Sequence, residues 1–178
     1  VLSNCGSAQR PNRVWDCTIA PNGGTGIRLE AGAHHNIIDR NRIDAEQDAG
    51  PGAPCGTTGI VITGAGTSHN TITFNRIKNA QTTGILVADG ANWNIIDSTL
   101  VSNSGQDGIV IDNSDNTSLL TVAVGRSKGN GIVLRNGADG TVIDSPTPPA
   151  TFVPTDPWEM PQSPVSTNWT EVSSNTGH

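Results

Sequence analysis

Residues 84–112 read GILVADGANWNIIDSTLVSNSGQDGIVID, and this stretch holds one complete unit of an internal repeat followed by the start of the next unit. Each unit opens with a glycine and then alternating aliphatic residues. A period of roughly 20 to 50 residues indicates a solenoid, a propeller or another repeat architecture. The opening segment recurs, with spacings of 33, 25, 24 and 23 residues, at Gly26, Gly59, Gly84, Gly108 and Gly131.

Two further short segments follow the opening segment in each unit. Their apolar residues alternate with polar ones, which is typical of strands and not of helices. A propeller blade needs about 40 residues and four strands, so a shorter unit with three strands predicts one turn of a triangular parallel coil. The second segment starts at Asn12, Asn36, Asn70, Asn94, Ser118 and Thr141, and the third starts at Cys17, Asn41, Asn75 and Thr99.

These Gly-Ile-x-Ile and Asn-x-Ile-x-x-Asn-x-Ile patterns resemble the right-handed parallel β-helix superfamily of pectin-lyase-like and NosD-like repeat proteins, over roughly Asn12 to Ser145. The resemblance implies an all-β, single-chain right-handed parallel β-helix with three-strand coils and about five to six rungs. We expect this domain at residues 1–145, with a loop insertion at about 45–58 that is rich in proline and glycine. Residues 146–178 are expected to form an extended Pro-rich tail. The matching residues build the coil, so they indicate the fold and say very little about the activity of the protein.

The alternation also predicts which side chains point into the coil. Equivalent residues of successive units are expected to form columns about 4.8 Å apart along the stack. Burial of one large aliphatic side chain stabilises the fold by roughly 1.5–3 kcal/mol. The expected columns are Ile27, Ile60, Ile85, Ile109 and Ile132; Leu29, Ile62, Val87, Ile111 and Leu134; and Val14, Ile38, Ile72, Ile96, Leu120 and Ile143.

Asparagines open the second segment of four units and occupy equivalent corners. A tight corner leaves backbone groups unpaired, and an inward amide supplies both donors and acceptors for them. In the superfamily that the chain resembles, such asparagines hydrogen-bond to one another along the stack. We therefore interpret as a structural ladder the residues Asn12, Asn36, Asn70 and Asn94.

The outward positions of the first segment include an apolar stripe, which consists of Val61, Leu86, Val110 and Val133. A parallel sheet covered on both faces reads as continuous aliphatic sequence, as these segments do. The tail at 146–178 carries several large apolar residues, which is unusual for a disordered segment. We expect the tail to cover the stripe. The alternative is that stripe and tail both serve an interface with another chain.

Composition bounds the partners and the compartment. Charged residues make up 15% of the chain, the formal net charge is −6, and the Lys and Arg residues are scattered, which argues against a nucleic-acid partner. No apolar run approaches the roughly 20 residues that a membrane span needs. The chain opens at Val1 without a signal peptide, which fits a processed protein or part of a longer one. We expect a secreted, extracellular or cell-surface protein.

The three cysteines permit one disulfide, and their spacing matches no zinc motif. The pairing stays open.

His35, His69 and Trp93 occupy equivalent corners of three successive units, with His34 beside them. Rings one coil apart can stack, and a stack of imidazole and indole could form a platform for a sugar. A stack that only shields the corner, and a metal site formed by two histidines, are the alternatives; no third ligand is evident, so we assign no metal site.

No catalytic constellation is evident. The triplet from Arg76 to Lys78 matches one polygalacturonase signature, but it is also the third segment of a unit, and the other signatures are missing. Asp39, Asp97 and Asp144 are expected to face outward on the second segment, with Thr73 and Thr121 between them, and consecutive aspartates would lie roughly 10 Å apart. That separation is too long for a shared calcium ion and marginal for an inverting glycosidase.

Two main hypotheses of function follow, beside a third, which is a periplasmic metal-handling role by analogy with NosD-like repeats. The first is an extracellular module with a structural, adhesive or filament-forming role that includes glycan binding, partnered by copies of itself, by other surface proteins or by polysaccharide. The second is a polysaccharide lyase or glycoside hydrolase, which the superfamily resemblance implies. No cofactor is expected, except calcium if the protein is a lyase. Whether the protein is an enzyme stays open.

Overall fold

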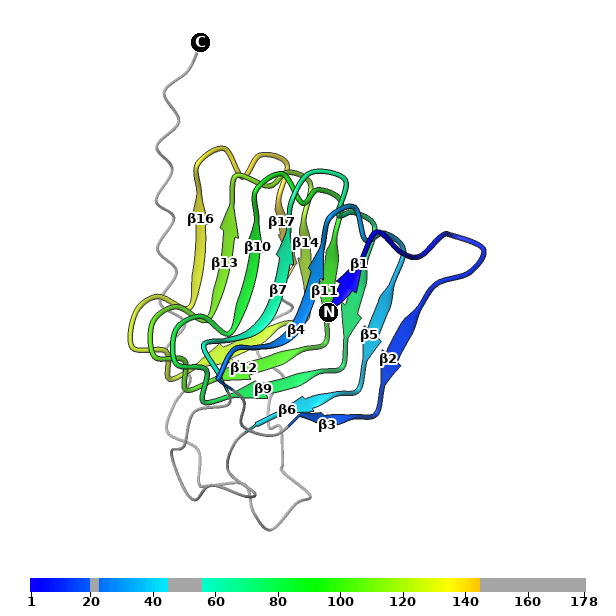
Figure 1. Cartoon of the computed structure of the whole chain (residues 1–178). Coiled ribbons are helices and arrows are strands. Elements are labelled where there is room, and N and C mark those ends of the chain that lie inside the picture. The colour runs from blue at the N-terminus through cyan, green and yellow to red at the C-terminus, as the bar shows by residue number, and fades with distance from the viewer. Residues whose placement is uncertain (20–22, 45–55, 145–178) are drawn as a thin grey trace.

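The chain winds into about five turns of a parallel β-solenoid (Figure 1). The structure is a computed structural model and describes residues 1–19, 23–44 and 56–144. Within these residues the strands form three sheets, A, B and C, of six, six and five strands. Every strand pairing is parallel and joins a strand to its counterpart in the neighbouring coil, so the expected parallel β-helix is confirmed.

The strands are short, and each coil contributes one strand to each sheet, except that the last described coil has strands in sheets A and B alone. Sheet A contains β1 (Leu2–Ser3), β4 (Thr25–Glu30), β7 (Thr58–Thr63), β10 (Ile85–Ala88), β13 (Ile109–Asp112) and β16 (Ile132–Arg135). Sheet B contains β2 (Arg13–Trp15), β5 (Ile37–Asp39), β8 (Thr71–Thr73), β11 (Ile95–Asp97), β14 (Ser118–Leu120) and β17 (Val142–Asp144). Sheet C contains β3 (Thr18–Ile19), β6 (Arg42–Ile43), β9 (Arg76–Lys78), β12 (Leu100–Ser102) and β15 (Ala123–Gly125). The described part of the chain contains no helix that could span a membrane.

The core lies inside the coil and consists of aliphatic columns. Ile60 pairs with Ile85 and Ile62 pairs with Val87, so like residues stack on like along sheet A. All four of these side chains are fully buried. The first two columns expected from the sequence are found, and their members at the last coil, Ile132 and Leu134, pack against the same core.

The glycines that open each unit are required by close contact between neighbouring coils. A Cβ atom at Gly59 would lie 2.6 Å from the carbonyl oxygen of Gly84, and one at Gly84 would lie 2.7 Å from that of Gly108. Each such Cβ would also lie within 2.4 Å of a core side chain, Ile77 or Val101. Any larger residue would therefore push two coils apart at this position.

The third column differs from the sequence expectation at one coil. Leu119, not Leu120, pairs with Ile96 and points inward, and Leu119 is fully buried. Leu120 pairs with Asp97 and Asp144 on the outer side of sheet B, so Thr121 is not an outward strand residue but the following corner. The corner before β14 has one residue fewer than the corner before β11. The inward residue of β14 therefore lies one position earlier in the sequence than the repeat pattern predicts.

Asparagine side chains hydrogen-bond from coil to coil at the corner between sheets A and B. The Nδ2 atoms of Asn12, Asn36 and Asn70 each donate to the Oδ1 atom of the next asparagine, at 3.0 Å. The backbone N–H of Asn36 also donates to the Oδ1 of Asn70, at 2.9 Å. The column ends after Asn94 in Thr117 and Thr141, because Ser118 is the first residue of β14.

A second ladder stands at the corner between sheets B and C. The Nδ2 atom of Asn41 donates to the Oδ1 atom of Asn75, at 3.0 Å, and both side chains are buried. Cys17 occupies the same column one coil earlier and donates its backbone N–H to Asn41. Two buried polar ladders therefore fix the register of the short strands of sheet B at both ends.

Candidate functional site

A column of rings projects from the corner between sheets A and B. The imidazoles of His35 and His69 are stacked, with 7° between their planes and 5.0 Å between their centroids. The indole of Trp93 continues the stack, at 11° and 6.3 Å from His69. His34 lies edge-on to His35, and their Nδ1 atoms are 3.1 Å apart. Trp93 is 55% exposed, so the stack ends in an accessible aromatic surface.

The corner conformation beneath these rings is unfavourable for bulky residues. His35, His69 and Trp93 have φ angles of 56°, 55° and 59°, in the left-handed region that favours glycine and asparagine. The next two coils hold this corner with Asn116 and Gly140, which suit that conformation. A non-glycine residue in this region costs of order 1–3 kcal/mol. The three rings are therefore kept at a conformational cost that asparagine or glycine would reduce.

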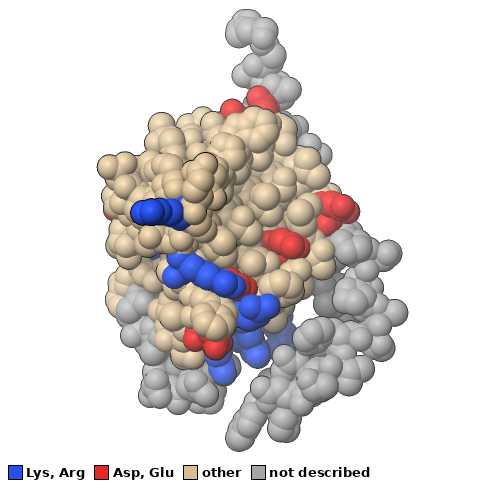
Figure 2. Space-filling view, turned by 90° about the vertical axis from the view of Figure 1, so that its right-hand side faces the viewer, with Lys and Arg blue, Asp and Glu red and all other residues tan. Residues whose placement is uncertain are grey.

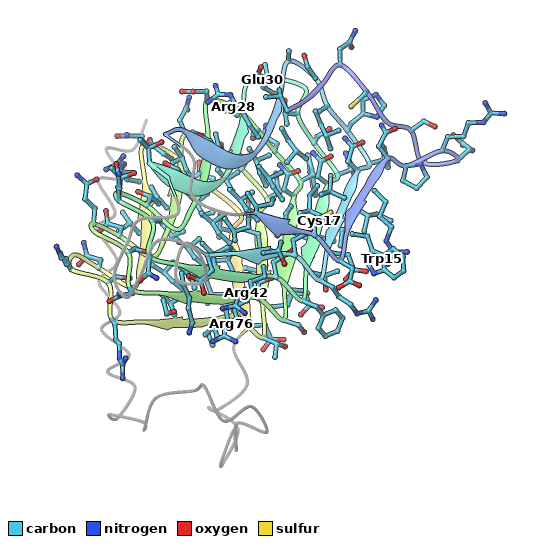
Figure 3. The ribbon with its side chains drawn as sticks, turned by 60° about the horizontal axis from the view of Figure 1, so that its bottom comes forward. Trp15, Cys17, Arg28, Glu30, Arg42 and Arg76 are labelled. Carbon is cyan, nitrogen blue, oxygen red and sulfur yellow. The ribbon has the colours of Figure 1, made fainter. Side chains whose placement is uncertain are left out.

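The opposite edge of sheet B carries a second group of aromatic and charged side chains. Trp15 and Phe74 are 54% and 55% exposed. The Arg13 guanidinium lies 5.3 Å from the centroid of the Trp15 ring, and the Arg40 guanidinium lies 5.5 Å from that of Phe74. Both arginines form ion pairs with Asp39. Figure 3 shows Trp15 on the outside of the coil, at the N-terminal end of the stack.

Asp39 is the centre of this group. Its side chain is 4% exposed, and its Oδ2 atom receives both guanidinium groups. Its Oδ1 atom is buried and has no hydrogen-bond partner among the described residues. A buried carboxylate oxygen normally has a partner. This atom is shielded from the surface, so it does not face a ligand on the outside of the coil.

Between the two aromatic edges lies the outer face of sheet B. Thr71 and Thr73 on β8, and Asp97 on β11, are half-buried there and can hydrogen-bond to a ligand. Ile95 is 38% exposed on the same face. The face thus combines exposed rings at both edges with hydroxyl and carboxylate groups between them.

The other residues singled out by the sequence lie elsewhere on the coil. The stripe of Val61, Leu86, Val110 and Val133 lies on the outer side of sheet A; the three valines are buried and Leu86 is half-buried. The tail expected to cover this stripe, 146–178, lies outside the described residues. Most of the insertion, 45–55, lies outside them too, together with Cys55. Cys5 and Cys17 are free thiols.

Sheet C carries the basic triplet considered above. Arg42 and Arg76 are in register in successive coils and lie side by side (Figure 3). Arg42 forms an ion pair with the buried Asp44, at 3.2 Å. Asp44 also accepts a hydrogen bond from Asn79. In the described ranges, no group of three or more His, Cys, Asp or Glu side chains is arranged to hold a metal ion.

Sequence reasoning identified one edge of the sheet B face and missed the other. The three-ring column was found because each ring directly precedes a ladder position. The group around Asp39 was missed, although the signal was present: Arg40 and Phe74 each directly precede Asn41 and Asn75, the members of the second ladder.

Parallel pairing, a three-sheet coil and two polar ladders define a parallel β-solenoid repeat protein. Residues 5–92 and 58–145 match the family model described as the right handed beta helix region. The chain belongs to the right-handed β-helix family. Searches of curated proteins and of solved structures found no match to the chain.

Proposed function

We propose that this β-helix is a secreted or cell-surface adhesion module that binds glycan chains on the outer face of sheet B. The observation that carries the proposal is the column of near-parallel rings formed by His35, His69 and Trp93. A flat aromatic surface packs against the apolar C–H face of a sugar ring, while the hydroxyl groups around that ring need polar partners. The sheet B face supplies both.

The rigidity of the site supports the same function. Neighbouring strands of a sheet hold the rings at the spacing of the coils, about 4.8 Å, so little conformational freedom is lost when a ligand binds. Asn116 and Gly140 show that the corner does not need a ring for folding.

Polar groups along the face give a glycan its orientation. Thr71 and Thr73 offer hydroxyl groups, and Asp97 offers a carboxylate whose Oδ1 atom already accepts from Ser98, at 3.0 Å. A chain that crosses sheet B from the Trp93 edge to the Phe74 edge spans about five residues of extended backbone, roughly 16 Å, which matches about three sugar units.

The test is a binding measurement against a panel of soluble neutral and acidic polysaccharides, by calorimetry. In the double variant His69→Asn with Trp93→Asn, asparagine takes the place that it already holds at position 116. We expect at least a tenfold loss of affinity, because the exposed Trp93 ring and the His69 ring that supports it are both removed. Val142→Ser is the matched control, since Ser118 holds the equivalent place one coil earlier and Val142 is outside the ring column. Full affinity in the double variant, or no binding to any glycan by the native protein, would reject the proposal.

A further inference from the structure

Two guanidinium groups converge on the outer side of sheet B. The Nη2 atom of Arg13 and the Nη1 atom of Arg40 both donate to the Oδ2 atom of Asp39. Because they share one acceptor, these two nitrogen atoms lie within roughly 6 Å of each other. The arginine side chains are 48% and 56% exposed, whereas the side chain of Asp39 is 4% exposed. The two arginines therefore form an exposed layer over a buried carboxylate.

The arginine pair lies on the flank of the coil. Arg13 and Trp15 are the outward residues of β2, since Val14 between them packs against the core. Arg40 is the corner residue after β5, and Phe74 is the corner residue one coil later. The pair thus lies across the first and second coils from outside, and it involves no unpaired edge of a sheet.

Each guanidinium group is held over a ring and keeps most of its donors available. Arg13 lies over Trp15, and Arg40 lies over Phe74. A guanidinium group is planar and directs its five N–H groups along its edges, so contact through its face leaves them available for hydrogen bonds. Within the described residues, each group donates to Asp39 alone. The rings and the carboxylate position both groups before a ligand binds, which lowers the entropic cost of binding.

The surroundings of the pair carry an excess of positive charge. Among the described residues up to position 78 there are seven Lys or Arg against four Asp or Glu, whereas from 79 to 144 the numbers are three against seven. Asp39 is shared by two arginines, and Asp16, at the corner one coil before Arg40, forms no ion pair with a described residue. Figure 2 faces the side on which β2 and β5 lie in Figure 1, and Lys and Arg gather in its middle and lower part. A positive field of this kind attracts anionic ligands.

The two guanidinium groups select an anion with three terminal oxygen atoms. Each group can form a two-pronged hydrogen bond, which occupies two oxygen atoms of the ligand. A sulfate ester or a phosphate monoester can therefore bond to both groups at once by sharing one of its three oxygen atoms. A carboxylate or a phosphodiester has two such atoms and fills one group. The exposed rings of Trp15 and Phe74 beside the arginines suit the apolar face of a sugar.

We propose that Arg13 and Arg40 bind a sulfate or phosphate monoester group on a glycan chain that lies on sheet B. The site for the anionic group stands on the arginine pair, and the glycan that carries the group rests on the proposed function. The ring column at the opposite edge of the sheet holds sugar units, and the arginine pair fixes the position of the charged substituent.

The first test uses the ions alone. Sodium sulfate and sodium phosphate are titrated at constant ionic strength, and the Nε–Hε signals of the arginines are followed by NMR. We expect saturable shifts at Arg13 and Arg40 and none at Arg28, which pairs with Glu30 on sheet A. The ion with the lower midpoint identifies the preferred ester. An absence of saturable shifts, or equal shifts at Arg28, would overturn the proposal.

The second test measures the affinity for polymers by calorimetry. Dextran sulfate and phosphorylated dextran are the probes, and carboxymethyl dextran and oligothymidylate carry groups with two terminal oxygen atoms. The double variant Arg13→Lys with Arg40→Lys keeps the charges and the ion pairs with Asp39 but loses the two-pronged bonds. We expect it to bind the preferred ester polymer at least about tenfold more weakly. Arg28→Lys is the matched control and should bind as the native protein does, and circular dichroism checks that both variants fold.

The outcomes separate this site from the proposed function. Full affinity in the double lysine variant would show diffuse attraction and overturn the proposal, as would equally tight binding of carboxymethyl dextran or oligothymidylate. Shifts with the ions but no binding of any ester polymer would support the arginine site and reject the glycan. Binding that is lost with His69→Asn and Trp93→Asn but kept in the double lysine variant would support the proposed function and reject the arginine site.

Discussion

The imidazole of His35 lies parallel to that of His69, with 5.0 Å between centroids, although 34 residues separate them in the sequence. The intervening insertion makes this unit longer than the others. The register of sheet B is nevertheless unchanged across it, since Ile38 pairs with Ile72. The coil thus accommodates extra residues at one corner without moving the side chains of the opposite corner.

The first prediction concerns the stability of the ring column. Trp93→Asn should change the free energy of unfolding by less than about 1 kcal/mol, because relief of the left-handed corner offsets the lost stacking with His69. Chemical denaturation measures this. Trp93→Val, which introduces a β-branched residue at the same φ of 59°, should be clearly less stable than Trp93→Asn. Equal stability of the two variants would contradict the assignment of strain.

The second prediction concerns contact between coils at the repeat glycines. Gly84→Ala should destabilise the fold by about 1–3 kcal/mol or more, because its Cβ would meet Val101 at 2.2 Å and the Gly108 carbonyl at 2.7 Å. Gly125→Ala is the control, since nothing lies within 4 Å of its Cβ position. Thermal unfolding followed by circular dichroism compares the two, and similar melting temperatures would count against the close contact.

The third prediction concerns the asparagine ladder. Asn70→Ala removes the acceptor of two hydrogen bonds from Asn36 and the donor of bonds to Asn94 and Ala33, all buried. Unpaired buried groups cost about 1–3 kcal/mol each, so we expect a loss of at least 3 kcal/mol. Arg135→Ala, which removes an exposed bond to Asp112, should cost less than about 1 kcal/mol. Urea denaturation of both variants measures the difference in free energy of unfolding. A small loss for Asn70→Ala would indicate that water molecules take over the hydrogen bonds of the ladder.

The fourth prediction tests the register of β14. Leu119→Ala should cost about 2–5 kcal/mol, because Leu119 is fully buried in the core. Leu120→Ala should cost less than about 1 kcal/mol, because Leu120 is on the outer side of the same strand. A lower melting temperature for Leu119→Ala than for Leu120→Ala would support the register seen in the structure. The reverse order would indicate that Leu120 is the inward residue.

The fifth prediction concerns residues 146–178, which we propose, from the sequence, to cover the stripe of Val61, Leu86, Val110 and Val133. Removal of this segment should lower the melting temperature and increase the fluorescence of a dye that binds apolar surface. As a comparison, Val110→Thr in the full chain should lower stability but leave dye binding low. A truncated protein with unchanged melting temperature and dye binding would exclude the covering role.

The fold could be predicted because its signal is repeated. Each glycine is fixed by the carbonyl of the next coil, and each aliphatic residue by its neighbours in a column, so both patterns are visible in the sequence. The error at Leu120 arose where the repeat weakens. There the ladder asparagine is replaced by Thr117, the corner is one residue shorter, and two adjacent leucines fit the inward position equally well.

The candidate site could be predicted only in part. The sequence places His35, His69 and Trp93 in one column, but not the 7° and 11° between their planes, which depend on side-chain rotamers. The group around Asp39 depends on Arg13 reaching across to the next coil and on Arg40 lying over Phe74. Long, flexible side chains have many rotamers, so such contacts follow from the fold and not from spacing.

The glycine contacts have a consequence for how this protein can change in length. Since Gly84 contacts only its own coil and the neighbouring coils, duplication of one unit of about 24 residues would reproduce every existing junction and create no new kind of contact. Deletion of a whole unit would do the same, whereas loss of a few residues within a strand would misalign all three sheets. The fold therefore tolerates insertion or deletion of whole coils, and it tolerates extra residues at corners such as the one that carries the insertion.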